Sequence, residues 1–136
     1  MFDIFNDPTV MALKKDLDTG TLRQKVIANN LANLNTPGFK KSFVSFEEQL
    51  QASMGKDKLP MRTTRSGHIG GVKNPAEVEP KVEQQTNTSL RPDGNNVDAD
   101  EEMVNLAATQ VKYNTSAQAL SGYYSLVSQI ISSSRR

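Results

Sequence analysis

Two long stretches of this 136-residue sequence, one near each end, carry apolar or small residues at alternating spacings of three and four. In the first stretch, residues 7–35, the repeating positions are Val10, Leu13, Leu17, Gly20, Gln24, Ile27, Leu31 and Leu34. In the second stretch, residues 98–132, they are Met103, Leu106, Gln110, Tyr113, Ala117, Leu120, Tyr124, Val127 and Ile131. This alternation is the heptad pattern of helices that pack along their length in a coiled coil. The sequence therefore predicts a mainly α fold in which long amino- and carboxy-terminal helices pair.

Both stretches open with residues that favour the start of a helix. Asp7 and Pro8 suit the N-cap and the first helical position. Asp98 and Glu101 have the spacing of a capping box, with Asp100 as an alternative cap. The acidic residues at this point also place negative charge at the positive end of the helix dipole.

Each heptad stretch contains one glutamine at a repeating position, Gln24 in the first and Gln110 in the second. A single polar residue at such a position typically sets the register and the number of helices that pair. Alternatively, both glutamines lie at the edge of the interface, half exposed to water. The sequence alone leaves both interpretations open.

The first helix is predicted to stop at the sequence Asn35-Thr36-Pro37-Gly38. A residue that precedes proline is driven out of the α region. Pro37 and Gly38 then suit the two central positions of a type II turn, in which glycine supplies the positive φ. The turn redirects the chain into a second, shorter element.

Four apolar residues beyond the turn recur at spacings of four, three and four. They are Phe39, Phe43, Phe46 and Leu50. This spacing predicts a short amphipathic helix that folds back along the first one.

The middle of the chain differs in composition from both ends. Residues 51–96 are rich in Gly, Pro, Asn, Thr, Lys and Glu, and contain turn signals such as SGHIGG and RPDGNN. The stretch VEPKVEQQT alternates in a way that suits an edge strand or hairpin. We expect a short loop- or β-rich segment, either a small flap or a segment that a partner orders. Residues 1–50 and 97–136 would flank it and form one structural domain from both termini.

Composition argues against several classes of function. The chain has no Cys and a single histidine, His68, which leaves little material for a metal centre, a thiol nucleophile or a Ser-His-Asp triad. A net charge of +1 gives no strong basic field for nucleic acid. One local basic cluster exists, at Lys56, Lys58, Arg62, Arg65 and Lys73. We expect no enzyme activity, cofactor, metal, nucleic acid or small-molecule substrate.

No apolar run approaches the roughly 18 residues of a membrane span. The first ten residues carry Asp3 and Asp7 and lack the basic and apolar regions of a secretory signal. We therefore expect a chain without a cleavable signal peptide.

Four asparagines crowd the end of the first helix, although asparagine is a mediocre helix former. They are Asn29, Asn30, Asn33 and Asn35, and they surround the repeating positions without occupying them. One interpretation is that their amides bond to other chains pressed against the helix. The other is that they are ordinary surface residues.

The stretch that holds these asparagines, ANNLANLNTPGFK, closely resembles the amino-terminal signature of bacterial flagellar rod and hook proteins, typically A-N-N-[IL]-A-N-x-[NDS]-T-P-G-[YF]. The stretch GNNVDADEEMVNLAATQVKYNTSAQALS is similar to the matching carboxy-terminal region of the same proteins. Together these motifs cover about half of the chain. The short middle segment resembles the proximal rod members, because hook and distal rod proteins carry large inserted domains there.

The resemblance implies a structural subunit of the proximal rod of the flagellar basal body. Such a subunit packs with copies of itself and with other rod proteins into a hollow shaft that crosses the periplasm and transmits torque. It implies contacts with the hook–basal body connector protein and the inner-membrane ring, and export through the flagellar type III apparatus. The alternatives are a second, closely related short rod protein and a soluble helical export adaptor or chaperone.

On this interpretation, one set of residues holds the terminal helices together or fixes contacts between copies. The set comprises Leu13, Leu17, Gln24, Ile27, Asn29, Asn30, Leu31, Asn33, Leu34, Asn35, Pro37, Gly38, Phe39, Leu106, Gln110, Tyr113, Leu120, Tyr124 and Val127.

Overall fold

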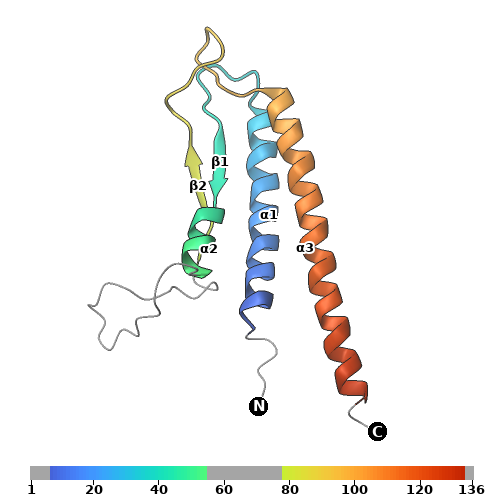
Figure 1. Ribbon diagram of the computed structural model, residues 1–136. Helices are drawn as coiled ribbons and strands as arrows, with labels where there is room; N and C mark the ends of the chain where they lie inside the picture. Colours follow the sequence, from blue (N-terminus) through green and yellow to red (C-terminus); the bar gives the residue numbers. More distant parts are fainter. Residues whose placement is uncertain (1–6, 55–77, 134–136) are drawn as a thin grey trace, which may run out of the picture.

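A computed structural model describes residues 7–54 and 78–133 of the chain (Figure 1). Its elements, in order, are α1 (Pro8–Ala32), β1 (Ser42–Ser45), α2 (Glu47–Met54), β2 (Lys81–Gln84) and α3 (Ala99–Ser133). The two long helices lie side by side and run in opposite directions, so the start of α1 and the end of α3 share one end of the molecule (Figure 1). The predicted mainly α fold with two paired terminal helices is confirmed. His68 and the basic cluster lie outside the described residues.

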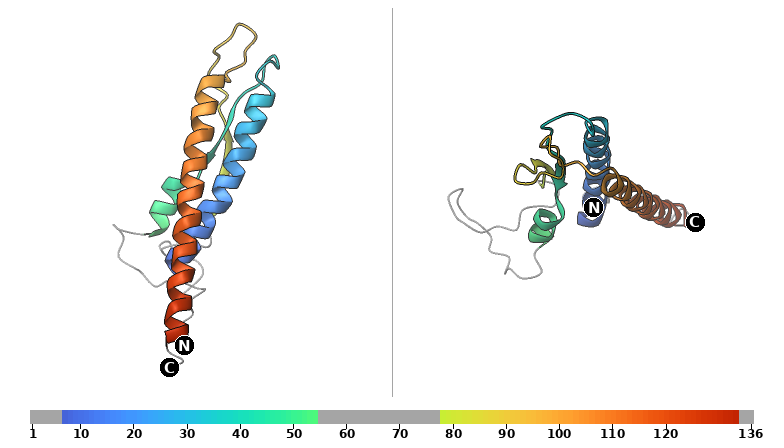
Figure 2. Two further views of the ribbon diagram at one scale, coloured as in Figure 1. Left: turned by 90° about the vertical axis from the view of Figure 1, so that its right-hand side faces the viewer. Right: turned by 90° about the horizontal axis from the view of Figure 1, so that it is seen from above.

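α1 occupies the middle of the molecule, with α3 on one side and the two-stranded sheet on the other. The view from above in Figure 2 shows this order of sheet, α1 and α3. α1 contacts both α3 and β1, so it needs buried residues on two of its faces. This explains why its buried residues do not form a single stripe.

The two ends of α1 follow the local signals. Asp7 is the N-cap, and its carboxylate accepts a hydrogen bond from the Thr9 backbone nitrogen at 2.8 Å, with Pro8 in the first helical turn. At the other end Asn33 is the C-cap, and its backbone N–H donates back to Asn29 and Asn30. The predicted start of the first helix is therefore confirmed.

The short helix predicted from the spacing of Phe39, Phe43, Phe46 and Leu50 is wrong in its first half. Residues 42–45 form β1, and α2 begins only at Glu47. In β1 the side chains alternate, with Val44 buried and Phe43 45% exposed. That alternation matches the period of two of a strand.

β2 pairs with β1 in antiparallel register, with Val44 opposite Val82 and Phe43 opposite Glu83. The edge strand expected within VEPKVEQQT is thus confirmed. All four residues of β2 are exposed, so this strand forms the outer layer of the molecule.

α3 starts as the capping signals predict. The Asp98 carboxylate accepts from the backbone nitrogen of Asp100 at 2.9 Å, so Asp98, and not Asp100, is the cap. The reciprocal half of the capping box is replaced, because the Glu101 carboxylate instead accepts from the Lys41 ammonium at 2.7 Å.

The apolar core is small. Its buried members are Val10, Ile27, Val44, Phe46, Val78 and Val97. Within residues 7–54 and 78–133, no helix combines the length and the apolarity needed to cross a lipid bilayer. Much of the remaining stabilisation of the fold must come from hydrogen bonds and ion pairs between the elements.

Candidate functional site: the paired terminal helices and the asparagine network

Most residues predicted to hold the two terminal helices together are buried or half-buried. On α1, Ile27 is buried, and Leu13, Leu17, Gln24 and Leu31 are half-buried, as is Leu34 just after the helix. On α3, Leu106, Tyr113, Leu120, Tyr124 and Val127 are half-buried, and Gln110 is exposed.

The residues of α3 that are most deeply buried are not the predicted heptad positions. The buried residues of α3 are Glu102, Thr109 and Ser116, seven residues apart. Each of these is the neighbour of a predicted heptad position. Met103, predicted to face the partner helix, is 58% exposed, and that prediction is wrong for the pairing within this chain. Ile131 is 53% exposed and lies beyond the start of α1, where α3 has no partner helix within the chain.

Four polar pairs, here called the cross-helix pairs, join α1 and the residue before it to α3. They are Asp7 Oδ2 with Tyr123 Oη at 3.0 Å, Asp16 Oδ2 with Ser116 Oγ at 2.6 Å, Gln24 Nε2 with Gln110 Oε1 at 3.0 Å, and Asn30 Nδ2 with Glu102 Oε2 at 3.0 Å. Residue numbers rise along one helix as they fall along the other, so all four pairs support the same antiparallel register. A shift of either helix by one turn would break all of them together.

The two predicted glutamines therefore meet each other, and they do so at the exposed edge of the interface. Their bond supports the register interpretation, and its exposure agrees with the edge interpretation. Both descriptions apply to the same pair.

At Gly20, α1 and α3 approach each other closely. A Cβ placed on Gly20 would lie 3.1 Å from Cδ2 of Tyr113, closer than a comfortable van der Waals contact. The absent side chain thus makes room for the tyrosine ring of the opposite helix.

The Asp7–Tyr123 pair has a consistent electrostatic signature. Hydrogen bonds from the Thr9 backbone and from Tyr123 lower the pKa of Asp7 below its ordinary value. The same contact raises the pKa of Tyr123, because the ionised carboxylate favours the protonated phenol. This pair closes the interface at the first residue that the structure describes.

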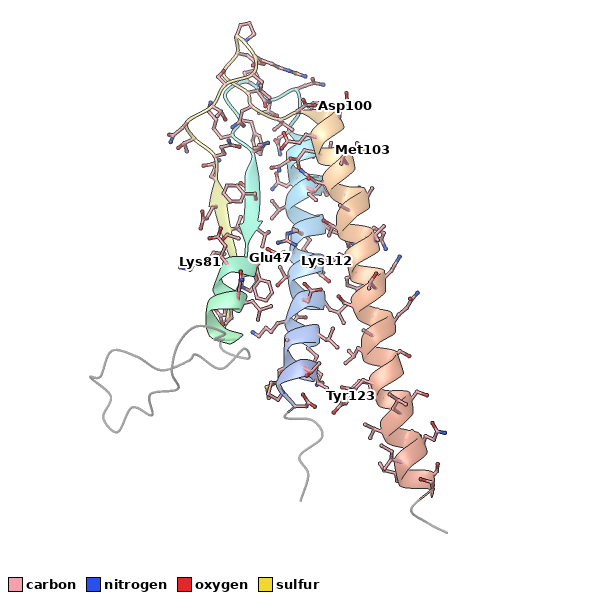
Figure 3. All side chains as sticks on the ribbon, viewed as in Figure 1. Glu47, Lys81, Asp100, Met103, Lys112 and Tyr123 are labelled. Carbon is pink, nitrogen blue, oxygen red and sulfur yellow. The ribbon has the colours of Figure 1, made fainter. Side chains whose placement is uncertain are left out.

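A cluster of four charged residues joins α2 to both long helices. Lys112 lies 3.0 Å from Asp16 and 2.9 Å from Glu47, and Arg23 lies 2.6 Å from Glu47. Partial burial of Glu47 opposes ionisation, but hydrogen bonds from Arg23 and Lys112 outweigh it and lower the pKa of Glu47 to about 2. Burial likewise opposes the charge of Lys112, yet Glu47 and Asp16 raise its pKa. Figure 3 labels both Glu47, on α2, and Lys112, on α3.

Asn30 accounts for part of the asparagine cluster. It is 1% exposed, and its amide donates to the Ser42 carbonyl at 2.8 Å and accepts from the Ser42 nitrogen at 3.0 Å. A side-chain amide here completes hydrogen bonds that a neighbouring strand would otherwise make with β1. The same amide also reaches Glu102, so one residue connects α1, β1 and α3.

The other three asparagines are arranged differently. Asn33 donates from Nδ2 to the Asn29 carbonyl at 2.9 Å and to Asn29 Oδ1 at 2.8 Å, which reinforces the last turn of α1. Asn29 and Asn35 are exposed. Asn30 is thus committed within the chain, and Asn29 and Asn35 remain accessible to a neighbour.

The turn after α1 has the predicted geometry. Gly38 has φ of +71°, and the Phe39 nitrogen donates to the Thr36 carbonyl at 3.3 Å, which closes a turn with Pro37 and Gly38 at its centre. These are the features of a type II turn. Pro37 and Gly38 are exposed, and Phe39 is half-buried.

A second pair of asparagines, which sequence reasoning missed as functional residues, holds this turn in place. Asn95 is fully buried, and its Nδ2 donates to the carbonyls of Asn33, Leu34 and Thr36 at 3.0, 3.0 and 2.9 Å. These carbonyls follow the last helical residue and need donors. Because Asn95 sits in the GNNVD stretch, the two terminal motifs meet here in space.

Asn96 bonds in the same way to the backbone at the start of β1. It is 1% exposed, accepts from the Lys41 nitrogen at 2.6 Å and donates to the Gln85 carbonyl at 2.8 Å. Two consecutive asparagines after a glycine, just before a helix cap, were the available signal for both residues. Every buried side-chain nitrogen and oxygen among the described residues has a hydrogen-bond partner.

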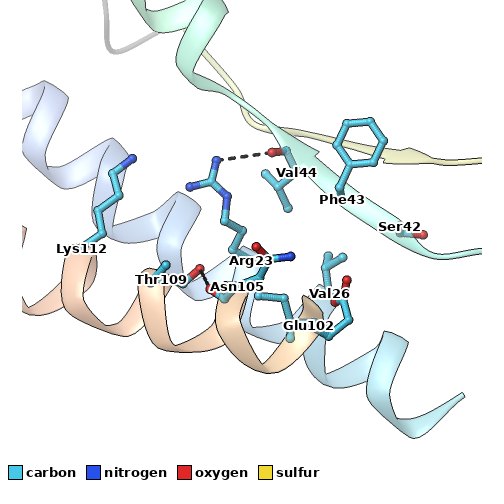
Figure 4. A pocket seen from close by; sticks show the side chains of 11 residues that line it. Arg23, Val26, Ser42, Phe43, Val44, Glu102, Asn105, Thr109 and Lys112 are labelled. Carbon is cyan, nitrogen blue, oxygen red and sulfur yellow. Dashed lines mark hydrogen bonds between the residues drawn. The ribbon is translucent and has the colours of Figure 1, made fainter. Parts of the chain in front are cut away.

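A groove of about 330 Å³ runs between α3 and β1 over the surface of α1 (Figure 4). Val26, Val44 and Ala108 contribute apolar lining. Its charged residues, Arg23, Glu102 and Lys112, are already bonded within the chain. Nowhere in residues 7–54 and 78–133 do three His, Cys, Asp or Glu side chains gather as metal ligands would.

The outer side of α3 exposes several large apolar side chains. Met103, Val104, Val111, Leu126 and Ile130 are between 58% and 68% exposed. No charged residue occurs from residue 113 to residue 133. A solvent-exposed helix normally carries charged residues on its outer face, so this surface has the character of an interface.

Comparison with known proteins agrees with this arrangement. The family model described as "Flagella basal body rod protein" matches residues 21–40, the stretch that contains the asparagine cluster and the turn. The chain is 33% identical over 120 residues to the flagellar basal body rod protein FlgB of Borreliella burgdorferi, covering 85% of this chain and 89% of the relative. It is 29% identical over 123 residues to FlgB of Bacillus subtilis, with 90% and 92% covered. With FlgB of Escherichia coli it shares 32% identity over 125 residues, with 85% and 87% covered.

The two terminal helices are paired, and the GNNVD loop before α3 bonds to the Asn-Thr-Pro-Gly turn after α1. Together with the family match, this arrangement defines a flagellar rod protein. The resemblance found in the two terminal motifs is therefore confirmed. The chain belongs to the FlgB family of flagellar basal body rod proteins. The alternative of a second, closely related short rod protein is not favoured, because each of these three relatives is a FlgB protein.

Proposed function

We propose that this chain is a non-catalytic subunit of the proximal rod, which assembles with copies of itself and with other rod proteins into a hollow shaft that transmits torque. The observation that carries the proposal is the outer side of α3, which exposes large apolar side chains, is free of charge from residue 113 to residue 133 and is not covered by any described part of the chain. Exposed apolar surface of this extent is costly in water and is typical of a surface that another protein covers.

The cross-helix pairs support a mechanical role for the subunit. Four hydrogen-bonded pairs fix the antiparallel register of α1 and α3 along the whole length of α1. Two helices that cannot slide past each other present one rigid surface to their neighbours. A shaft that transmits torque needs subunits of this kind.

The location and the further partners are part of the same proposal. We place the chain in the part of the rod that crosses the periplasm, in contact with the hook–basal body connector protein and the inner-membrane ring. Its proposed route is the flagellar type III export apparatus. The absence of cysteine is compatible with the passage of an unfolded chain, which cannot be cross-linked by disulfides.

A soluble export adaptor or chaperone is the main alternative from another class. Such a protein would use similar helices to bind its cargo reversibly, and it would be folded and active without a rod. The similarity to rod proteins over at least 85% of the chain favours the rod subunit.

The test is to delete the gene and to image the cell envelope by electron cryotomography. We expect a membrane ring and export apparatus without rod, hook or filament, because the first axial component is missing. Intact flagella would contradict an essential rod role. An assembled rod in cells that fail to export other subunits would favour the adaptor.

A further inference from the structure

The two edges of the small sheet differ in what lies beside them. The edge of β1 that faces away from β2 is closed by side chains of α1. Asn30 bonds both backbone groups of Ser42, and Arg23 donates to the Val44 carbonyl at 3.4 Å. β2 is the strand farther from α1, and all four of its residues are exposed (Figure 1). Of the two edges, only the outer edge of β2 is open to a further strand.

The hydrogen bonds between the strands show which backbone groups of β2 point outward. The Gln85 nitrogen donates to the Lys41 carbonyl at 2.9 Å, one step beyond the last pair of the strand register. Hydrogen-bonded and non-hydrogen-bonded pairs alternate along an antiparallel ladder. Lys81 and Glu83 therefore bond to β1, whereas the N–H and C=O groups of Val82 point away from it. No described residue bonds to these outward groups of Val82.

β2 also leaves apolar surface uncovered. Val82 lies opposite the buried Val44, so both side chains are on the same face of the sheet. Yet Val82 is 51% exposed, because the sheet ends at this strand. A two-stranded ribbon is marginally stable in water, and a further strand beside β2 would strengthen it.

The charges of β2 complement those of a second β2 in one register. In an antiparallel pair of two such strands, outward backbone groups must face outward groups. Two registers meet this condition and overlap by three residues of β2. With Val82 opposite Val82 of the second copy, Lys81 faces Glu83 on both sides of the centre. With Val82 opposite Gln84, Glu83 faces Glu83, and like charges directly opposite each other are destabilising.

We propose that two copies of the chain pair through β2 in the first register, around a two-fold axis at Val82, and form a four-stranded antiparallel sheet. The two Val82 backbones exchange hydrogen bonds, and a Lys81–Glu83 pair lies on each side of them. Such a contact is the same on both copies and closes on itself, whereas a helical shaft needs contacts that repeat in one direction. The dimer is therefore a form of the free subunit, and the proposal does not depend on the function proposed above.

Exchanging the two charges tests this register. Lys81, labelled in Figure 3, and Glu83 are both exposed and lie opposite uncharged residues of β1, so their replacement leaves the pairing within the chain intact. The variants of the full chain are Lys81→Glu, Glu83→Lys and the double variant. The matched control is Glu79→Lys, because Glu79 is exposed and would face the uncharged Gln85 of the second copy. Sedimentation velocity over a series of protein concentrations measures the dissociation constant, and circular dichroism checks the fold.

We expect the unchanged chain and Glu79→Lys to dimerise alike. Each single variant at residue 81 or 83 should weaken the dimer at least about tenfold, because it places two like-charged pairs in the contact. The double variant should restore the dimer, and so should a mixture of the two single variants, since opposite charges then face each other again.

An unchanged chain that stays monomeric at every concentration would overturn the proposal. Self-association that neither single variant weakens would also overturn it, and would assign the contact to another surface, such as the outer side of α3. Failure of both the double variant and the mixture to restore a weakened dimer would exclude the register with Val82 at its centre.

Discussion

Asn30 on α1 and Glu102 on α3 form a buried pair in which the asparagine amide donates to the carboxylate at 3.0 Å. Their side chains are the point at which three elements meet, since Asn30 also bonds both backbone groups of Ser42 on β1. The residues are 1% and 4% exposed, so water cannot replace a bond that is lost.

Replacing Asn30 by Ala should therefore lower the free energy of unfolding by about 2–4 kcal/mol, because it leaves Glu102 and the Ser42 backbone with fewer partners. The matched control is Asn29→Ala at the preceding, exposed position, which should cost no more than about 1 kcal/mol. Urea denaturation followed by circular dichroism measures both. Equal losses for the two variants would show that burial of Asn30 is unimportant.

Gly20 and Gly122 offer a comparison of two helical glycines. Gly122→Ala should stabilise the chain by about 0.5–1 kcal/mol, since its Cβ meets no atom within 4 Å and alanine favours the helix. Gly20→Ala should be about 0.5–1.5 kcal/mol less stabilising than Gly122→Ala, because its Cβ presses on Tyr113. Thermal melts of the two variants test the difference, and identical gains would refute the close approach of the helices at Gly20.

Replacing Gly38 by Val should strain the turn and block incorporation into the rod. Its φ of +71° disfavours a β-branched residue by about 1–2 kcal/mol or more, and no neighbouring atom lies within 4 Å of a Cβ placed there. The destabilisation of the valine variant therefore comes from backbone strain and not from a clash. Asparagine tolerates a positive φ, so Gly38→Asn should retain most of the function. Swimming in soft agar and rod imaging read the outcome. Normal incorporation of the valine variant would count against a positive φ in the assembled state.

The pH dependence of stability should carry the signature of Glu47. The pKa of this carboxyl falls from 4.5 to about 2 in the folded chain. A group with a lowered folded-state pKa contributes stability that is complete above pH 4.5 and is lost as the pH falls through 2. Because the side chain is 52% exposed, we expect about 1 kcal/mol or less from it. Urea titrations between pH 6 and pH 2 should show a shallower decline for Glu47→Gln than for the neighbouring Glu48→Gln, and parallel curves would exclude the effect.

Placing aspartates at Leu31 and Leu120 together should abolish rod assembly, since each carboxylate would enter a half-buried apolar contact of the helix pair. Aspartates at the neighbouring exposed positions Ala28 and Ser121 serve as the control for added charge. Circular dichroism of the purified chains should show the loss of pairing in the first variant only. Rods that still form with Leu31→Asp and Leu120→Asp would contradict a role of this pairing in assembly.

Local signals in the sequence predict much of this fold, because they act over a few residues. The caps at Asp7 and Asp98 and the turn at Gly38 depend on chemistry within four residues of each position. The strand at residues 42–45 was mistaken for helix, because the spacing of its phenylalanines also suits a helix. The strand is stabilised by the amide of Asn30, which bonds to the backbone of Ser42 from 12 residues away in sequence.

The face of α3 was mispredicted for a different reason. Heptad analysis follows apolar residues, and the positions buried against α1 include Glu102, Thr109 and Ser116. Polar residues become buried only when a partner is available, and partners such as Asp16 for Ser116 are found from the antiparallel register, which periodicity alone cannot supply. For the same reason the roles of Asn95 and Asn96 required the structure.

The bonds from Asn95 to the end of α1 also impose an order of events on a chain that is made, or delivered, from its amino terminus. α1 ends at residue 32, but the carbonyls that follow it are bonded by the side-chain amide of Asn95, which comes 59 to 62 residues later. Until that residue arrives, the end of the first helix stays hydrated and is free to unwind. The subunit therefore cannot complete its fold until about two thirds of the chain has emerged. Before that point the chain can stay unfolded.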